Sequence, residues 1–328
     1  MMAEAVLSIR DLCVEIPTRH GVLRPVEAMS YDIAAGEILG VVGESGAGKS
    51  MAGNAVIGLL DPPDRIVSGE IWLNGTRIDH LTGEEMRRFR GRSIGMIFQD
   101  PLTSLNPLLR IGDQLVETIL THLDISRPEA EQRAVAALED VGIAAAAERI
   151  DSFPHEFSGG MRQRVVIALA LCAEPALIIA DEPTTALDVS VQAQIIALLK
   201  QLCRDKGVAV MLITHDMGVI ASAANRVAVM YAGRLAEIGP VREVLSHPAH
   251  PYTDGLMGST PAASLGQDRL RQIPGAMPRL TALPGGCAFH PRCDRASDRC
   301  RIGETPRIGP EMPRAACWHP LSGAGDLS

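Results

Sequence analysis

Hydrophobic residues in the first three quarters of the chain fall into short runs separated by amphipathic helical stretches, which is typical of an α/β domain. Three β-branched apolar runs have the pattern of buried parallel strands, at 37–42, 176–180 and 208–214. Strands of a mixed or antiparallel layer are expected at 7–16, 30–33 and 69–74. The spacing predicts a helix over 49–59 and a helical insertion over 111–150. The fold class expected is therefore α/β, with a mostly parallel core sheet, an antiparallel β layer and a helical insertion.

The distribution of proline predicts a boundary near residue 246. Eleven of the 22 prolines lie in residues 247–320, where they interrupt any long helical or strand pattern. We therefore predict one domain over 1–245, with a helical subdomain at about 100–165, and a small proline- and cysteine-rich domain over 246–328.

Composition and charge exclude several classes of function. The 328 residues are 46% apolar and carry a net charge of −8, which fits a folded protein and disfavours nucleic acid as a partner. Apolar runs fall well short of the ~20 residues that span a bilayer. The chain does not begin with a signal-peptide pattern, so we expect it to stay in the cytoplasm.

A glycine-rich loop between the strand at 37–42 and the helix at 49–59 matches the pattern G-x-x-x-x-G-K-[ST]. Backbone N–H groups of such a loop hold phosphates at a helix N-terminus, the lysine adds a positive charge, and the hydroxyl binds Mg²⁺. The predicted nucleotide-binding residues are Gly43, Glu44, Ser45, Gly46, Ala47, Gly48, Lys49, Ser50 and Met51.

Two carboxylates follow a second apolar strand. Asp181 and Glu182 end the run at 177–180, so they are expected at the same sheet edge as the phosphate loop. Asp181 can hold Mg²⁺ through water, and Glu182 can polarise the water that attacks the γ-phosphate.

A second anion-binding site is predicted where Phe157 precedes a serine and two glycines at the start of a helical pattern. Two such sites on one chain imply that the second contacts a nucleotide held by another chain. Its residues are Ser158, Gly159, Gly160 and Met161.

With these motifs in order, residues 5–245 resemble the ATP-binding-cassette family. Gln99, Asp188 and His215 look like the glutamine, aspartate and switch histidine of that family's conserved loops. The resemblance implies that Glu182, His215 and Gln99 are catalytic and that Ser50, Gln99 and Asp181 hold Mg²⁺. It also implies a head-to-tail dimer with two ATP molecules between the subunits, in which the segment Ser158–Met161 contacts the partner's ATP.

Three features depart from the family pattern. Many members have Gln where this chain has Met161, and Phe157 replaces the usual Leu. The aromatic residue that stacks on adenine is not evident, and His20 stands near its place. His20 is therefore the candidate for stacking on the base, with a surface-loop histidine as the alternative.

Finer resemblance points to the dipeptide/oligopeptide and nickel permease ATPases. It rests on the loop at 43–46, the segment at 98–107, the family's signature segment at 158–164, the segment at 181–188 and the segment His247-Pro-Ala-His-Pro-Tyr-Thr253. The chain has one cassette, no coiled-coil heptads and no membrane helices, as expected of a detached importer ATPase. Segment 99–117 is expected to meet the permease helices, with exposed helical surface as the alternative.

This resemblance implies a set of partners and a location. The partners are a second related ATPase subunit, two transmembrane permease subunits and an extracytoplasmic solute-binding protein, and the location is the cytoplasmic face of the bacterial inner membrane. Two alternatives stay open: an importer of nickel or another small solute, and a soluble regulatory ATPase without a membrane partner.

Four cysteines lie among the prolines of the C-terminal domain, at Cys287, Cys293, Cys300 and Cys317. Four thiolates can hold a zinc ion or a [4Fe–4S] cluster, and the spacings lack the short knuckles of zinc ribbons. Members of the permease group resemble this tail, and some carry an iron–sulfur cluster there. A structural [4Fe–4S] cluster is therefore predicted, with zinc or unligated or disulfide-linked thiols as alternatives. We expect Cys300→Ser to unfold the tail and leave nucleotide binding largely intact.

Overall fold

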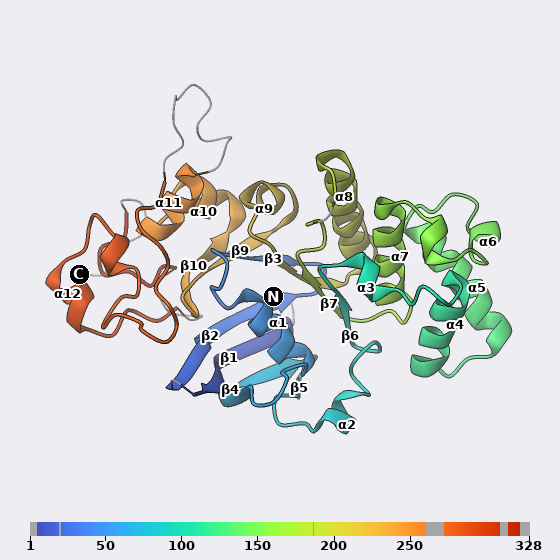
Figure 1. Ribbon diagram of the computed structural model, residues 1–328, viewed down its shortest axis with the longest axis horizontal. Helices are drawn as coiled ribbons and strands as arrows, with labels where there is room; N and C mark the ends of the chain where they lie inside the picture. Colours follow the sequence, from blue (N-terminus) through green and yellow to red (C-terminus); the bar gives the residue numbers. More distant parts are fainter. Residues whose placement is uncertain (1–4, 20, 186, 260–271, 309–313, 322–328) are drawn as a thin grey trace. The chain divides into compact units, whose positions relative to one another are not determined.

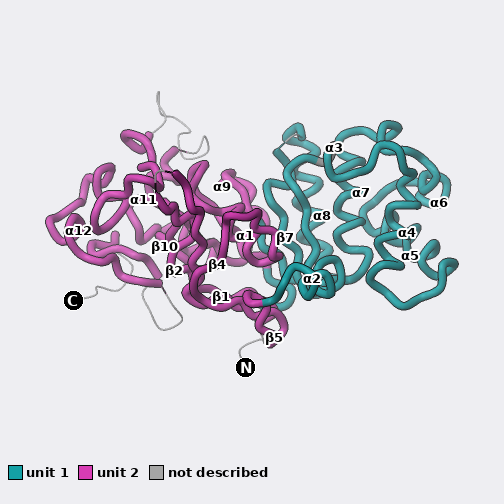
Figure 2. Tube along the Cα trace, turned by 60° about the horizontal axis from the view of Figure 1, so that its bottom comes forward, with its two compact units in different colours: residues 1–4, 34–37, 81–212 teal, residues 5–33, 38–80, 213–328 magenta. Residues whose placement is uncertain are grey.

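The computed structural model describes residues 5–19, 21–185, 187–259, 272–308 and 314–321. The chain divides into two compact units, which Figure 2 shows in different colours. The first unit contains described residues 34–37 and 81–212, and the second contains the described residues of 5–33, 38–80 and 213–328. Within the described part of the chain, no helix has the length and apolar character needed to cross a membrane.

The second unit contains a four-stranded sheet in the order β2-β1-β4-β5. Its strands are β1 (Ala5–Thr18), β2 (Gly21–Ala34), β4 (Arg65–Leu73) and β5 (Thr76–Arg77), and only Ala34, the last residue of β2, belongs to the first unit. β1 runs antiparallel to β4, with Leu7 opposite Leu73 and Ile9 opposite Ile71. All four side chains are buried, because residues two apart on a strand point to the same face. This sheet is the predicted antiparallel layer.

The same unit carries the strand that leads into the phosphate loop. This strand, β3 (Ile38–Val42), is buried throughout and pairs in parallel with β9 (Arg226–Tyr231), which forms an antiparallel hairpin with β10 (Arg234–Pro240). Helices α1 (Lys49–Ile57) and α9 (Met217–Ala223), which are labelled in Figure 1, belong to this unit as well. A Cβ atom on Gly40 of β3 would lie 2.4 Å from Ile220 Cδ1 of α9, so α9 packs closely on β3 and a larger residue there would displace the Ile220 side chain.

The first unit contains strands β6 (Ile94–Ile97), β7 (Leu177–Asp181) and all but the last residue of β8 (Ala209–Ile213). β6 and β7 are parallel neighbours, with Ile97 opposite Ala180. The helices are α2 (Gly83–Met86), α3 (Pro101–Ser104), α4 (Ile111–His122), α5 (Arg127–Asp140), α6 (Ala146–Arg149), η1 (Pro154–Glu156), α7 (Gly159–Leu171) and α8 (Val189–Lys206). Helices α4, α5 and α7 pack on one another, which confirms the predicted helical insertion.

After β10 and α10 (Val241–Ser246), the chain enters a segment with little regular structure. We call the described part of residues 246–328 the C-terminal extension; it contains α11 (Pro251–Gly258), η3 (His290–Arg292) and α12 (Asp298–Ile302). One fully buried carboxylate fastens it to β10. Glu237 accepts hydrogen bonds from the N–H groups of Ala249 and His250, both at 2.9 Å, and pairs with Arg314 at 3.0 Å. A buried charge of this kind is stable only when it is paired and hydrogen-bonded.

The strand predictions at 37–42, 176–180 and 208–214 are confirmed as β3, β7 and β8. The fold class is confirmed as well, with parallel pairs β3–β9 and β6–β7 and a separate sheet around β1. The predicted strand at 30–33 is only the end of β2, a strand of 14 residues. The predicted domain boundary at 245 stays a prediction.

Candidate nucleotide-binding and catalytic site

The predicted phosphate loop lies between β3 and α1, in the second unit. Gly43 and Gly48 have positive φ angles of 156° and 101°. A Cβ atom would lie 2.2 Å from Met230 O at Gly43 and 1.8 Å from Pro25 O at Gly48. Only glycine fits these two positions, so the motif's glycines are explained by how closely the loop packs on its neighbours.

Lys49 folds back over the loop. Its side chain is buried, and Nζ donates to Gly43 O at 2.9 Å and Glu44 O at 3.1 Å. The turn between β9 and β10 also contacts the loop, since Gly233 N donates a hydrogen bond to Ala47 O at 3.0 Å. The positive charge of Lys49 is thus held at the place where the motif requires it for phosphates.

His215 follows β8 and lies in the second unit. Thr214 N donates to Val41 O at 3.1 Å, which brings residue 215 to the end of β3 from which the phosphate loop departs. Asp216 then starts α9 by accepting hydrogen bonds from Gly218 N and Val219 N. The His215 side chain is exposed, as a group that meets a bound nucleotide must be.

The predicted base and glutamine lie together in the first unit. Because β6 and β7 are parallel and in register, residues after their carboxyl ends share one edge. Gln99 Nε2 donates to Glu182 Oε2 at 3.3 Å, and Thr185 Oγ1 donates to the same oxygen at 2.8 Å. Glu182 has a φ of 47°, a conformation that is costly outside glycine and is often found at functional sites. Its carboxylate is therefore held in one orientation beside Gln99, directly after Asp181.

The predicted signature starts helix α7. Ser158 is exposed, and its Oγ accepts from Met161 N at 3.4 Å, which leaves the helix N-terminus on the surface. A Cβ atom on Gly160 would lie 2.7 Å from Val191 Cγ1 of α8, and Asp188 caps α8 by accepting from Val191 N at 2.9 Å. The signature and the Asp188 loop are thus brought together.

Phe157 precedes the signature and is buried, with Arg149 stacked on its ring at 5.8 Å. Phe157, where the family usually has leucine, therefore contributes to the hydrophobic core.

Sequence analysis missed one set of contacts on the phosphate loop. Glu44 N donates to Tyr252 Oη at 2.9 Å, and the Glu44 carboxylate accepts from Arg292 Nη1 at 2.8 Å. Tyr252 lies in the segment that carried the permease resemblance. Nothing local in the sequence marks Arg292, which lies 248 positions from its partner.

Two predicted features find no geometric support. His20, the proposed adenine-stacking residue, lies outside the described residues. Among the residues that the structure describes, no three His, Cys, Asp or Glu side chains form a group that could hold a metal ion. The roles of Ser50, Gln99 and Asp181 toward Mg²⁺ stay predictions.

The four C-terminal cysteines all line one cavity of about 20 Å³, together with His290, His319 and Trp318. Burial raises the pKa of Cys287 and Cys293, and that of Cys317 to about 11, so these thiols stay protonated near neutral pH unless a metal replaces the proton. The donor set suits a thiolate centre, but a cavity of this size holds little more than one water. The arrangement therefore gives no support to the predicted [4Fe–4S] cluster.

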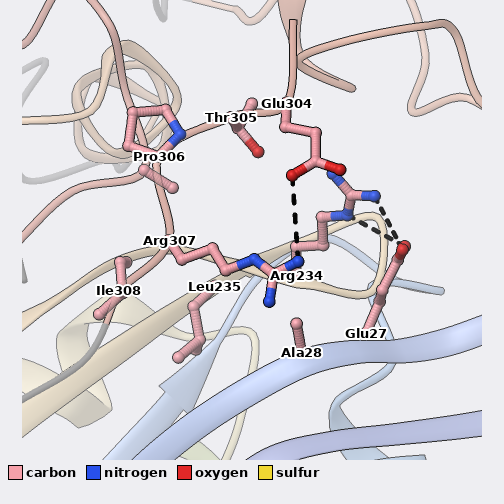
Figure 3. A pocket seen from close by; sticks show the side chains of 10 residues that line it. Glu27, Ala28, Arg234, Leu235, Glu304, Thr305, Pro306, Arg307 and Ile308 are labelled. Carbon is pink, nitrogen blue, oxygen red and sulfur yellow. Dashed lines mark hydrogen bonds and ion pairs between the residues drawn. The ribbon is translucent and has the colours of Figure 1, made fainter.

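The extension also packs against β2 and β10 at a second cavity, of about 100 Å³ (Figure 3). Arg234 of β10 pairs with Glu27 of β2 at 2.9 Å, and Glu304 pairs with Arg307 of the extension at 4.0 Å. Charges of both signs line this cavity, so it favours no one class of charged ligand.

Comparison with known proteins places these features in families. Residues 26–185 match the family model for ABC transporters, and residues 236–300 match the model for the C-terminal region of oligopeptide/dipeptide transporters. The dipeptide transport ATP-binding protein DppD of Bacillus subtilis is 46% identical over 319 residues, which are 96% of this chain and 95% of the relative. The oligopeptide transport ATP-binding protein OppD of Escherichia coli is 47% identical over 298 residues, 91% and 88% of the two chains.

Solved structures show the same cassette. A dimeric post-hydrolysis state of the ATP-binding cassette MJ0796, bound to ADP and Pi, aligns with a TM-score of 0.64 at 26% identity. The alignment covers 72% of this chain and 99% of that cassette. CbiO1 from Clostridium perfringens, part of the ABC transporter complex cbiONQ, aligns with a TM-score of 0.65 at 27% identity over 74% and 91% of the two chains.

Proposed function

Since this chain belongs to the ABC transporter family, we propose that it is the ATP-hydrolysing subunit of an importer for dipeptides or oligopeptides. One observation carries the proposal: a single chain joins the ABC cassette to the oligopeptide/dipeptide C-terminal region and spans 95% of the length of a dipeptide transport ATP-binding protein. The permease and the solute-binding protein determine which solute is transported. This chain supplies the energy of ATP hydrolysis and does not select the solute.

The proposed hydrolysis divides the work among the predicted residues. Residues 43–51 bind the phosphates, with Lys49 neutralising their charge. Ser50, Asp181 and Gln99 would hold Mg²⁺, which would supply positive charge to offset the charge that develops on the phosphates. Glu182 accepts the proton of the attacking water, and its hydrogen bonds from Gln99 and Thr185 support this role by fixing its orientation. His215 stabilises the γ-phosphate of the bound ATP.

A second ATPase subunit completes each site in this proposal. The exposed N-terminus of α7, with Ser158, Gly159, Gly160 and Met161, binds the partner's ATP, and Asp188 lies beside it at the start of α8. The dimer of ATPase subunits closes when ATP binds and reopens after hydrolysis. This shift between two conformations can do work on another protein. The partner is a related ATPase subunit.

Two permease subunits and an extracytoplasmic solute-binding protein are the further partners, and the protein works at the cytoplasmic face of the bacterial inner membrane. Segment 99–117 is the proposed permease contact. Gln114 is buried and donates to Asn106 O and Leu109 O, both at 3.1 Å. These bonds shape the loop on which Leu108 is 82% exposed. Leu109, the next residue, is 37% exposed as well. Two adjacent exposed leucines form an apolar surface, which supports docking to another subunit.

The test is reconstitution of this chain with its permease subunits, partner ATPase and binding protein in vesicles. We expect uptake of a radiolabelled dipeptide that depends on ATP. Leu108→Ser should abolish uptake while the ATPase activity of the chain without permease subunits is kept. The matched control is Leu120→Ser, at a leucine of α4 that is 37% exposed, which should transport normally.

Other outcomes separate the alternatives. Uptake of nickel without dipeptide uptake would identify a metal importer. Failure of any permease to copurify with an active ATPase would favour a soluble regulatory enzyme.

We also propose that Cys287, Cys293, Cys300 and Cys317 bind a [4Fe–4S] cluster, which would stabilise the extension. The proposal rests on the presence of four cysteines in one short region, whose thiolates are suitable iron ligands. In the described arrangement these side chains do not form a metal-binding group, so a bound cluster would require the thiols to move. Anaerobic purification followed by iron, zinc and acid-labile sulfide analysis tests it. About four irons with matching sulfide per chain are expected, zinc would reassign the centre, and no metal would leave free thiols.

A further inference from the structure

One of the contacts between the C-terminal extension and the phosphate loop is made by a buried guanidinium, that of Arg292. Arg292 Nη1 donates to both carboxylate oxygens of Glu44, at 2.8 and 3.1 Å. The Arg292 side chain is 7% exposed and that of Glu44 is 27% exposed, so this ion pair is far less open to solvent than a surface pair. Charged hydrogen bonds of this kind fix orientation as well as supplying energy.

Arg292 is itself held rigidly. Its Nε donates to Pro274 O at 2.8 Å, and its Nη1 also contacts Tyr231 Oη at 3.3 Å. The guanidinium lies 5.8 Å from the ring of Tyr231 and 5.9 Å from that of Phe289. Contacts from β9 and from two parts of the extension therefore meet at this side chain, whose position depends on how the extension is folded.

Glu44 has two further anchors. Its N–H donates to Oη of Tyr252, a fully buried residue of α11, and its carbonyl oxygen accepts from Lys49 Nζ. A third contact of the extension lies two residues on, where the Cβ position of Gly46 is 3.3 Å from Met277 Cε. The extension thus contacts the loop at residues 44 and 46 and fixes the backbone between β3 and the phosphate-binding turn.

Charge gives these contacts a consequence for nucleotide binding. Glu44 adds a carboxylate to a loop built to receive a polyanion, and like charges at short range oppose binding. Arg292 neutralises this carboxylate and turns it toward the extension. We propose that Arg292 is a positioning residue for ATP binding, by which the C-terminal extension sets the charge and shape of the phosphate loop. This inference rests on the proposed ATPase function.

The experiment measures the Kd of a fluorescent ATP analogue for the full chain, and KM and kcat for ATP hydrolysis by the full chain together with its partner ATPase subunit. Arg292→Gln is expected to raise KM and Kd about tenfold, which corresponds to about 1.4 kcal/mol, with kcat within about twofold of wild type. Arg292→Lys keeps the charge but loses the planar contacts of the guanidinium, so it should weaken binding less than Arg292→Gln does. The control Arg301→Gln removes an arginine of the same extension whose side chain is 58% exposed, and it should leave KM unchanged.

A second substitution separates charge from architecture. When Glu44→Gln is added to Arg292→Gln, the unpaired carboxylate disappears, so the double variant should bind the ATP analogue more tightly than Arg292→Gln alone. If Arg292 only held the tail in place, the double variant would bind as weakly as the single one.

Three results would overturn the inference: an unchanged KM in Arg292→Gln, a fall in kcat alone, or no recovery in the double variant. Should Arg292→Gln fail to fold by circular dichroism, Arg292→Lys decides, since a tenfold loss there would contradict the charge argument. Wild-type chain that hydrolyses no ATP even together with its partner ATPase subunit would instead refute the proposed function.

Discussion

At the scale of single residues, backbone geometry limits what the phosphate loop tolerates. Gly48 combines a positive φ with a Cβ position 1.8 Å from Pro25 O. We expect Gly48→Ala to lower the free energy of unfolding by about 1–3 kcal/mol and to weaken ATP binding, because the loop must move away from β2. Urea unfolding and a fluorescent ATP analogue measure the two effects. At Gly83, the first residue of α2, a Cβ meets nothing within 4 Å, so wild-type ATP binding is expected from Gly83→Ala.

The orientation of Glu182 predicts a separation of binding from chemistry. Glutamine keeps the shape of the side chain and can still accept from Thr185, but it cannot take a proton from water. Glu182→Gln should therefore bind ATP while turnover falls by about 10²–10⁴-fold. Phosphate release and equilibrium binding are the two measurements. Wild-type turnover in this variant would show that another group is the base. In the same unit, Glu174→Gln changes a carboxylate that is 65% exposed and pairs with Arg133, so it should hydrolyse ATP normally.

At the scale of elements, the start of α11 predicts a pH dependence of stability. His250 is the N-cap, and its Nδ1 accepts from Tyr252 N at 3.0 Å. The backbone N–H of His250 donates to the carboxylate of Glu237. The centroid of the imidazole ring lies 5.9 Å from that of the Phe289 ring. Burial lowers the pKa of His250 from 6.5 to about 4, because an imidazolium there would lose its solvation and the capping bond.

The sign follows from where the proton binds. Between pH 6.5 and 4 the unfolded chain takes up a proton that folded His250 excludes, so stability is fully present above pH 6.5 and falls as the pH drops. We expect this residue to account for a loss of about 2–3 kcal/mol between pH 7 and 4.5. His250→Asn keeps a capping acceptor without titrating. Its urea-unfolding profile should therefore be flatter than that of wild type, whereas His247→Asn, at an exposed neighbour, should follow wild type. Parallel profiles for all three proteins would refute the prediction.

Elements and motifs that are local in sequence could be predicted from it. The phosphate loop needs only glycines and a lysine in one short stretch between a strand and a helix. The contact of Gln99 with Glu182 follows from the parallel register of β6 and β7. Most of the extension could not be predicted in this way, because outside its short helices it is held by polar contacts with other parts of the chain, such as those of Arg292 with Glu44 and of Ala249 with Glu237 of β10. The spacing of hydrophobic residues along a sequence predicts helices and strands, but it does not predict hydrogen bonds between distant residues.

At the scale of the whole molecule, the extension cannot be treated as independent of the nucleotide. The expectation that Cys300→Ser would unfold the tail and largely spare ATP binding assumed two separate parts. Arg292 is the residue before Cys293, and Tyr252 belongs to α11, so disorder in the extension would remove two anchors of Glu44. We now expect Cys300→Ser to weaken ATP binding by as much as Arg292→Gln does.

Thermodynamic reciprocity gives this coupling a direct measure. If the folded extension strengthens ATP binding, bound ATP must stabilise the folded extension by the same factor. In Glu182→Gln, saturating ATP with Mg²⁺ should slow amide hydrogen exchange across residues 287–302 by up to about tenfold, because local opening of this segment would release Glu44. Exchange followed by mass spectrometry measures it peptide by peptide. The effect should vanish when Arg292→Gln is added, and protection confined to the loop around Lys49 in both proteins would show that the extension does not respond to the nucleotide.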